Sequence, residues 1–308
     1  MTKRVYVLAV VTAVGIGSMA VAASQAPAVQ DPPKTVTVDK LKDNLYVLKG
    51  GGGNTALFLT ATGAVVVDSK LPGWGQPLLD AIKGLTPKPV TMVINTHTHF
   101  DHASGQVEFP ATVEVVAHEN TKTYMRQANP VYGLQTGPQP NIFTEHGGRG
   151  MATRTFKDTL TIGSGADRIE LHYFGRAHTG GDAYVVFPAL GVMHAGDTFP
   201  NRALPIMDVN NGGSGVAFAA TLAKAAAVPG ITTVINGHND VTTTPADLKT
   251  YAEFIADFVT AVQSAKKAGK TVDDVVASWT TPAKYTGYAA PQAARVKADA
   301  QVVFTETK

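Results

Sequence analysis

INTHTHFDHASG, residues 94–105, contains three histidines and one aspartate within the six residues from His97 to His102. The chain has nine histidines in all, and this third of them directly follows a β-branched apolar run that predicts a buried strand. His97 and His99 lie two positions apart, so in an extended segment both rings point the same way and can hold one ion. Asp101 and His102 come after the chain turns, where they can face a neighbouring ion. Imidazole and carboxylate suit zinc, and also iron or manganese, so this stretch predicts a metal site.

An Asp or His also stands just past the end of four other predicted strands. These residues are Asp68 after residues 64–67, His178 after the strand ending at Phe174, Asp197 after residues 192–195 and His238 after residues 232–235. Sheet proteins gather ligand sites from such strand ends. Packing alone does not explain so many polar strand ends beside a dense histidine stretch, and we therefore expect the five segments to meet at one site.

These motifs resemble those of the metallo-β-lactamase-fold hydrolase superfamily. The similarity consists of His97-x-His99-x-Asp101-His102, AHTGGD around His178, AGDT around Asp197 and NGHND around His238, in that order, over roughly residues 36–258. The resemblance implies an α/β fold, namely an αββα sandwich of two mixed β-sheets flanked by helices. It also implies a dinuclear metal site at one edge of the sandwich.

Carried over residue by residue, the resemblance implies two Zn²⁺ ions, with iron or manganese left open. The first ion would bind His97, His99 and His178, the second would bind Asp101, His102 and His238, and Asp197 would bridge them. Asp68 matches an acid that ends an early strand in the family. It would hold a ligand or a loop by hydrogen bonds.

Such a site implies a hydrolase. A hydroxide held between two metals is available near neutral pH, because coordination lowers the pKa of water toward about 7. It would attack the carbonyl of a small-molecule substrate, which we expect to be a β-lactam, a lactone or a thioester. Asp101 is the candidate catalytic residue, because as a ligand it can also orient the hydroxide. The chain has no cysteine, which excludes a thiol nucleophile and the Cys-ligand subclass of β-lactamases.

Two other functions stay open at this point. One is a sulfur dioxygenase of the same fold, with a single iron on His97, His99 and a downstream Asp. The other is a non-catalytic metal-binding or interaction protein. Metal content measured together with oxygen consumption separates the first from a hydrolase, and turnover on a broad substrate panel separates the second.

Substrate contacts are expected from two irregular segments, residues 129–150 and 200–215, because long loops in compact domains are often functional. His146 and Arg149 in the first loop and Arg202 in the second are the candidate substrate residues, and either arginine could meet a substrate carboxylate. The glycine run at residues 50–53 is not interpreted as a phosphate loop, because no Lys-Ser/Thr follows it and a strand comes next. A flexible hairpin turn explains it.

The first 22 residues have the basic start, apolar run and small-residue boundary of a secretory signal peptide. A retained membrane anchor is the alternative, but cleavage would leave no stable anchor and would place the protein in the periplasm or outside the cell. Removing Lys3 and Arg4 from the 26 basic residues leaves 24 against 24 acidic ones. Without a basic cluster, we expect no nucleic-acid partner. Nothing in the sequence predicts an oligomeric state.

The rest of the chain predicts one catalytic domain. Residues 23–35 are interpreted as a linker, 36–269 as the metallo-β-lactamase-fold domain and 270–308 as a C-terminal helical extension packed on it. Thr244-Pro245-Ala246-Asp247 is typical of a helix start. Apolar residues spaced three and four apart then predict a helix that ends near Gly269.

Overall fold

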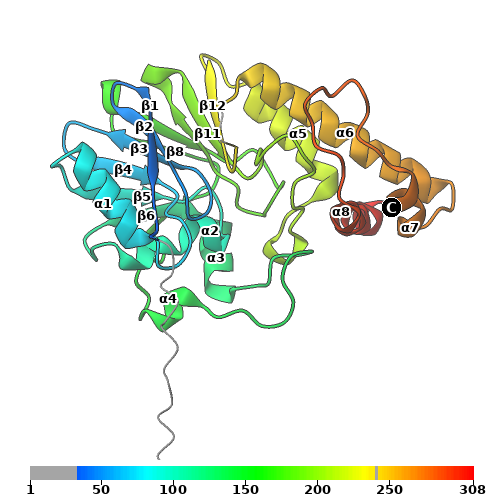
Figure 1. Ribbon diagram of the computed structural model, residues 1–308, viewed down its shortest axis with the longest axis horizontal. Coiled ribbons are helices and arrows are strands. Elements are labelled where there is room, and N and C mark those ends of the chain that lie inside the picture. The colour runs from blue at the N-terminus through cyan, green and yellow to red at the C-terminus, as the bar shows by residue number, and fades with distance from the viewer. Residues whose placement is uncertain (1–32, 240–241) are drawn as a thin grey trace, which may run out of the picture. The chain divides into compact units, whose positions relative to one another are not determined.

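The computed structural model describes residues 33–239 and 242–308 (Figure 1). Residues Lys34–Lys308 form one compact unit. The predicted signal peptide and most of the predicted linker lie outside the described residues. Among the residues that are described, no helix combines the length and apolar character needed to cross a membrane.

The first sheet has seven strands in the order in which they occur along the chain. They are β1 (Thr37–Lys42), β2 (Leu45–Lys49), β3 (Thr55–Leu59), β4 (Ala64–Val67), β5 (Val90–Ile94), β6 (Glu114–His118) and β7 (Arg154–Phe156). The first four pair antiparallel as a meander, and β4 to β7 pair parallel. Because β4 and β5 are parallel neighbours, the residues that follow them emerge at the same edge of the sheet.

The second sheet has five strands in the order β12-β11-β10-β9-β8. They are β8 (Thr159–Ile162), β9 (Ile169–His172), β10 (Tyr184–Phe187), β11 (Val192–Gly196) and β12 (Thr233–Asn236). Only β11 and β12 pair parallel, and the other pairs are antiparallel. The residues that follow β11 and β12 therefore also leave the sheet side by side.

The inner faces of the two sheets pack on each other. One buried cluster joins Leu45, Phe58 and Val67 of the first sheet to Val185 and Phe187 of the second. The rings of Phe58 and Phe187 have their centroids 4.9 Å apart. Apolar side chains that alternate along each strand supply this layer, as sheet-on-sheet packing requires.

Helices cover both outer faces (Figure 1). On the first sheet lie α1 (Gly75–Leu85), α2 (Phe100–Ala103), α3 (Glu119–Gln127), α4 (Ile142–Glu145) and the 3₁₀ turn η1 (Gly105–Glu108). On the second lie α5 (Gly215–Ala226), α6 (Pro245–Lys267), α7 (Val272–Ser278) and α8 (Ala293–Glu306). The remaining 3₁₀ turns are η2 (Gly165–Asp167), η3 (Pro188–Leu190) and η4 (Val209–Asn211). Two mixed sheets flanked by helices confirm the predicted αββα sandwich.

Local sequence explains where helix α6 begins and ends. Helix α6 begins with a capping box in which the Thr244 and Asp247 side chains each accept from the other residue's backbone N–H. Its apolar face packs in the same buried cluster as Phe218 of α5 and Val303 of α8. The predicted start at Thr244 agrees with this cap, and the helix ends two residues before Gly269.

Strands β7 and β8 and the short helices α2 and α4 were not predicted. β7 is only three residues long, and β8 alternates exposed and half-buried residues without a strong apolar pattern. Helix α4 lies inside the segment interpreted as an irregular loop. Each is short and depends on its neighbours for pairing or packing, which is why local periodicity did not reveal it.

Candidate metal centre

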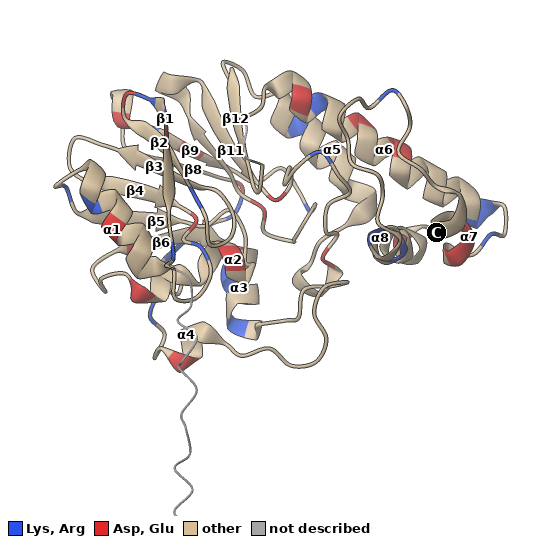
Figure 2. Ribbon diagram, in the orientation of Figure 1, with Lys and Arg blue, Asp and Glu red and all other residues tan. Residues whose placement is uncertain are grey.

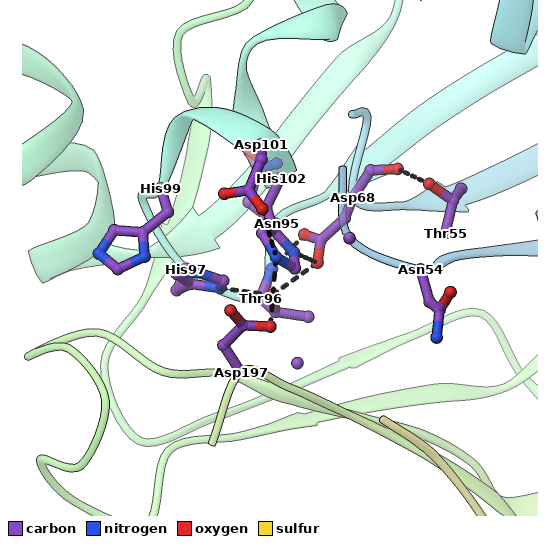
Figure 3. Close-up of polar contacts among 12 residues, drawn as sticks. Asn54, Thr55, Asp68, Asn95, Thr96, His97, His99, Asp101, His102 and Asp197 are labelled. Atoms are coloured by element: carbon purple, nitrogen blue, oxygen red, sulfur yellow. Dashed lines mark hydrogen bonds and ion pairs between the residues drawn. The ribbon is translucent and has the colours of Figure 1, made fainter. Parts of the chain in front are cut away.

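Two pairs of parallel strands bring most of the candidate ligands to one edge of the sandwich. Asp68 follows β4 and His97 lies three residues after β5, whereas Asp197 follows β11 and His238 lies two residues after β12. Figure 3 shows Asp197 facing the histidine stretch across the space between the two sheets. His178 joins them from the connection between β9 and β10.

The His97 ring is fixed by a chain of hydrogen bonds that starts at Asp68 (Figure 3). The Thr96 hydroxyl donates to Asp68 Oδ2 at 2.6 Å, and the Thr96 backbone N–H donates to Asp68 Oδ1 at 2.8 Å. The hydroxyl oxygen therefore accepts from His97 Nδ1–H, 2.9 Å away. His97 Nε2 is buried and makes no hydrogen bond to the described residues. Its lone pair is directed into the site without a partner, as a metal ligand requires.

Asp68 also orients His102. His102 Nδ1 lies 2.7 Å from Asp68 Oδ2, and because a carboxylate only accepts, Nδ1 carries the proton. The free Nε2 then lies 3.2 Å from His238 Nε2 and 3.2 Å from Asp197 Oδ1. Asp68 is wholly buried and has φ of 64°, a strained conformation that turns its carboxylate toward these two partners.

In His99 and His178, too, one ring nitrogen donates to a protein oxygen and the other is left as a possible ligand. His99 Nε2 donates to Asp208 Oδ2 at 2.7 Å, and His178 Nδ1 donates to the Ile206 carbonyl at 2.7 Å. The unprotonated His99 Nδ1 and His178 Nε2 are left facing each other at 3.0 Å. Two lone pairs at this distance repel unless a cation lies beside them, so the pair is arranged for a shared ion.

Asp197 lies between two groups of histidines. Its Oδ2 is 3.1 Å from His238 Nε2 and 3.8 Å from His178 Nε2. Its buried Oδ1 makes no hydrogen bond, although His102 Nε2 is 3.2 Å away. A second carboxylate also lies close to these rings: Asp101 Oδ2 is 3.3 Å from His238 Nε2 and 3.7 Å from His102 Nε2. The two oxygens of Asp197 are therefore available to neighbouring ions.

The protonation states suit metal ligands. Burial, together with the neighbouring histidines, lowers the pKa of His97 well below its ordinary value and that of His178 to about 3. Burial works to raise the pKa of Asp101, but His102 and His238 lower it to about 2. The site thus offers neutral imidazoles and charged carboxylates, the forms that bind cations.

His102 and His238 behave differently because two carboxylates face them. Burial lowers the pKa of each ring, but Asp197 and Asp101 outweigh it, raising the pKa of His238 to about 9 and that of His102 well above its ordinary value. A proton and a divalent cation are two ways of offsetting the same pair of carboxylates. Metal binding on this side must therefore displace protons.

The described residues contain two adjacent donor sets that fit divalent ions. His97, His99, His178 and Asp197 form one, with ligand atoms all within 4.8 Å of one another, and Asp101, His102 and His238 form the other. Asp68 also groups with His97 and His102, but its oxygens already accept from Thr96 and His102. We assign it to holding the ligands rather than the metal. The seven residues proposed as ligands from the sequence are thus brought together.

A cavity of about 320 Å³ opens over these donor sets. It is lined by His99, Phe100, Asp101, Val131, Leu134, His178, Asp197, Pro200, Asn201, Leu204, Pro205, Ile206, His238 and Arg295. Residues from both predicted loops contribute to the lining. Leu134 is 59% exposed and Phe100 37% exposed, so apolar side chains stand next to the metal ligands.

The three candidate substrate residues do not line this cavity. Arg202 pairs with Asp247 at 3.0 Å, and Arg149 donates to the Phe109 carbonyl at 2.9 Å. His146 Nδ1 donates to the Ile142 carbonyl at 2.8 Å within the α4 segment. Each group is thus held by a local partner, and the role of these three residues in substrate contact stays a prediction.

Three features of the site were not predicted. Asp208 was treated only as part of a loop, and Arg295 was not singled out at all. The glycine run was interpreted as a flexible turn, yet it packs tightly against the site: a Cβ on Gly53 would lie 2.1 Å from His102 Cε1, and one on Gly52 would lie 2.4 Å from the Asp101 carbonyl oxygen. Only long-range packing reveals these roles, because no local spacing connects the partners.

Comparison with known sequences and structures agrees with this geometry. The sequence profile of the metallo-beta-lactamase superfamily matches residues 48–240, and the chain belongs to that superfamily. The family and the His/Asp cluster together indicate a site for divalent metal.

Individual relatives match only part of the chain, at low sequence identity. The chain is 26% identical over 168 residues to metallo-beta-lactamase IND-1 of Chryseobacterium indologenes, covering 51% of this chain and 62% of that protein. It is 26% identical over 168 residues to the 2,4-dinitroanisole O-demethylase subunit alpha of Nocardioides sp. (strain JS1661), covering 53% of this chain and 46% of that protein. A 71-residue match to metallo-beta-lactamase domain-containing protein 1 of Rattus norvegicus is 37% identical and covers 22% of this chain and 28% of that protein. The chain therefore spans less than two thirds of each of these relatives.

Solved structures show the same fold. A metallo-beta-lactamase from Pontibacter korlensis superposes with a TM-score of 0.58 at 18% identity, covering 72% of this chain and 99% of that one. The sec-alkylsulfatase Pisa1 from Pseudomonas sp. superposes with a TM-score of 0.63 at 16% identity, covering 86% of this chain and 50% of that one. At these identities the similarity concerns the fold alone.

Proposed function

We propose that this protein is an exported, zinc-dependent hydrolase that cleaves a small molecule at a carbonyl group, with a β-lactam, a lactone or a thioester as substrate. The observation that carries the proposal is the position of Asp197. One of its oxygens lies near His238 and His178, and the other lies near His102. A carboxylate between two complete donor sets supports a dinuclear rather than a mononuclear site.

When bound, two divalent cations would supply a Lewis acid for the carbonyl and a water molecule of lowered pKa. The chain's own residues supply the rest. Asp68 and Asp208 hold the rings of His102 and His99 by charge-assisted hydrogen bonds, which fixes the direction of their lone pairs. Asp101 stays ionised near neutral pH and is only 20% exposed, so it can accept a hydrogen bond from water in the site and orient it.

The cavity supports a small substrate with an apolar part. Its volume of about 320 Å³ lies at the lower end of ordinary small-molecule pockets. Figure 2 shows Lys and Arg interspersed with Asp and Glu rather than gathered on one face. Without a basic stripe, a nucleic-acid substrate is not proposed.

The relatives are consistent with hydrolytic chemistry but differ in what their names say they act on. One is named a metallo-beta-lactamase and another an O-demethylase subunit. The proposal of a carbonyl substrate therefore rests on the site. Export to the periplasm or beyond is proposed from the N-terminal sequence pattern alone.

The test combines metal content with turnover. Protein purified without added metal should contain two divalent ions per chain and should hydrolyse at least one member of a panel of β-lactams, lactones and thioesters. One iron per chain with oxygen consumption would replace this proposal by the dioxygenase. Two metals without turnover on the panel, extended to phosphoesters and sulfate esters, would favour a non-catalytic metal-binding protein.

A further inference from the structure

An arginine from the C-terminal helix lines the same cavity as the metal ligands. Arg295 lies in the first turn of α8, more than fifty residues after His238, and it lines the cavity together with His178, Asp197 and His238. Apart from histidines, the other ionisable residues that line this cavity are the metal-ligand carboxylates Asp101 and Asp197. Arg295 is therefore a positively charged lining residue that does not serve as a metal ligand.

The Arg295 side chain is largely buried and incompletely paired. Only 17% of it is exposed, and its Nη1 is buried without a hydrogen bond to the described residues. Asp299, one turn further along α8, lies 3.6 Å from Nη1, which is too far for a hydrogen bond. A buried guanidinium N–H without an acceptor costs free energy, so the Arg295 side chain is not neutralised by a full set of protein partners.

Asp299 does not neutralise this arginine near neutral pH. Asp299 is wholly buried, and burial raises its pKa to about 8 even though Arg295 works to lower it. The carboxyl group is then mostly protonated near pH 7, and the positive charge of Arg295 remains available.

The surroundings of Arg295 favour one kind of ligand. The cavity that Arg295 lines also has apolar side chains, among them Val131, Leu134, Leu204 and Ile206. Apolar walls strengthen an interaction between a guanidinium and an anion, because they exclude water. The planar guanidinium fork matches a carboxylate through two parallel hydrogen bonds.

We propose that Arg295 determines substrate specificity by binding a carboxylate on the substrate, so that the preferred substrates are carboxylate-bearing esters, thioesters, lactones or lactams. This inference rests on the proposed hydrolase function. It replaces Arg149 and Arg202, which are held elsewhere, as the source of carboxylate recognition.

The experiment compares a charged substrate with its neutral counterpart. The metal-loaded full chain is assayed with mono-4-nitrophenyl glutarate, which carries a carboxylate, and with its methyl ester, which does not. In the Arg295→Met variant, we expect KM for the charged ester to rise about tenfold or more, as loss of a charge-assisted hydrogen bond predicts. We expect kcat to stay within about threefold of the wild-type value, and kinetics on the methyl ester to be unchanged. Arg295→Lys keeps the charge without the fork and should lie between the two.

Lys297→Met is the matched control. Lys297 lies two residues further along α8, is 63% exposed and pairs with Asp273 at 2.9 Å. It does not line the cavity, so its removal should leave the preference for the charged ester intact. An equal loss on both esters in Arg295→Met would mean that Arg295 only supports the structure, and this would overturn the proposal.

A binding measurement separates failure of this inference from failure of the hydrolase proposal. Calorimetric titration of the metal-loaded protein with glutarate and with neutral glutaramide requires no turnover. Glutarate should bind wild type about tenfold or more tightly than it binds Arg295→Met, and glutaramide should not distinguish them. If neither ester is hydrolysed but glutarate shows this difference, the ester-hydrolase activity fails and the carboxylate site stands. Equal glutarate affinity in the two proteins, or no binding to wild type, would contradict the site.

Discussion

His99 Nε2 lies 2.7 Å from Asp208 Oδ2, although the two residues are 109 positions apart in the chain. Asp208 is wholly buried, and its other oxygen accepts from the backbone N–H groups of Tyr132, Asn210 and Asn211. One carboxylate therefore joins a metal-ligand ring to both loops that border the cavity. The same carboxylate therefore orients the His99 ring and holds the two loops that line the cavity.

The Asp208→Asn substitution tests this connection. The amide keeps the size of the side chain but loses the charge that holds His99 Nε2–H, so the ring is less well oriented. We expect metal affinity or turnover to fall about 10–100-fold, the range found for such supporting partners. Zinc titration and kcat/KM measure the two quantities. Asp247→Asn, at the exposed start of α6, should change neither, and wild-type metal affinity in Asp208→Asn would show that Asp208 serves only the loops.

Gly53→Ala tests the packing of the glycine run against His102. A Cβ at Gly53 would lie 2.1 Å from His102 Cε1, so the ring or the loop must move. We expect loss of one metal per chain, a large fall in kcat and a destabilisation of about 1–3 kcal/mol from overpacking. Gly84→Ala on the exposed face of α1, where a new Cβ meets nothing within 4 Å, should instead stabilise the protein by up to about 1 kcal/mol. Unchanged metal content in Gly53→Ala would argue against close packing there.

Asp101→Ala should abolish turnover while the protein stays folded. Asp101 is part of the donor set with His102 and His238 and does not belong to the buried apolar clusters. We expect metal content to fall from two ions per chain toward one, with kcat reduced by at least about 100-fold. Circular dichroism checks the fold, and metal analysis checks the stoichiometry. Activity near the wild-type level would mean that the ligand assignment is wrong.

Removal of metal should affect stability as well as activity. Without cations, the unprotonated ring nitrogens of His97, His99 and His178 are buried with no hydrogen-bond donor directed at them. Ligand present at a thousandfold excess over its Kd stabilises a folded protein by about 4 kcal/mol. Chelation should therefore lower Tm by at least about 5 °C and abolish turnover, and added Zn²⁺ should restore both. A Tm that chelation leaves unchanged would indicate that these donors hold no metal.

Asp299 should make the folded protein less stable as pH rises. Burial raises its pKa to about 8 in the folded state, from 3.8 for an ordinary Asp. Unfolding therefore releases a proton between about pH 4 and pH 8, and higher pH favours unfolding by up to about 1.4 kcal/mol per pH unit. Asp182, whose pKa burial raises to about 7, contributes with the same sign.

The Asp299→Asn variant isolates this contribution. Urea denaturation between about pH 5 and pH 7 should show a smaller fall in the free energy of unfolding for the variant than for wild type. Its preference for mono-4-nitrophenyl glutarate over the methyl ester should persist, because Arg295 is unchanged. Identical pH slopes in the two proteins would show that Asp299 is ionised in the folded state.

Much of the site was predictable because its ligands occur in short motifs at strand ends. The two-residue spacing of His97 and His99, and the positions of Asp197 and His238 after apolar runs, depend only on local sequence. The αββα architecture followed from family resemblance, and the structure confirms it. The short strands β7 and β8 could not be predicted in this way, because they acquire their pairing from neighbours distant in the chain.

The amino-acid sequence by itself determined the chemistry of the donors: imidazole and carboxylate groups, no thiol, and their order along the chain. Tertiary structure alone decided how each ring is turned and what surrounds it. Asp208 contacts His99, and the His102 ring packs where a side chain on Gly53 would lie. Arg295 lines the cavity because α8 packs beside the second sheet. The physical reason is that ligand type is a property of a residue, whereas lone-pair direction and desolvation depend on partners that folding brings within a few ångströms.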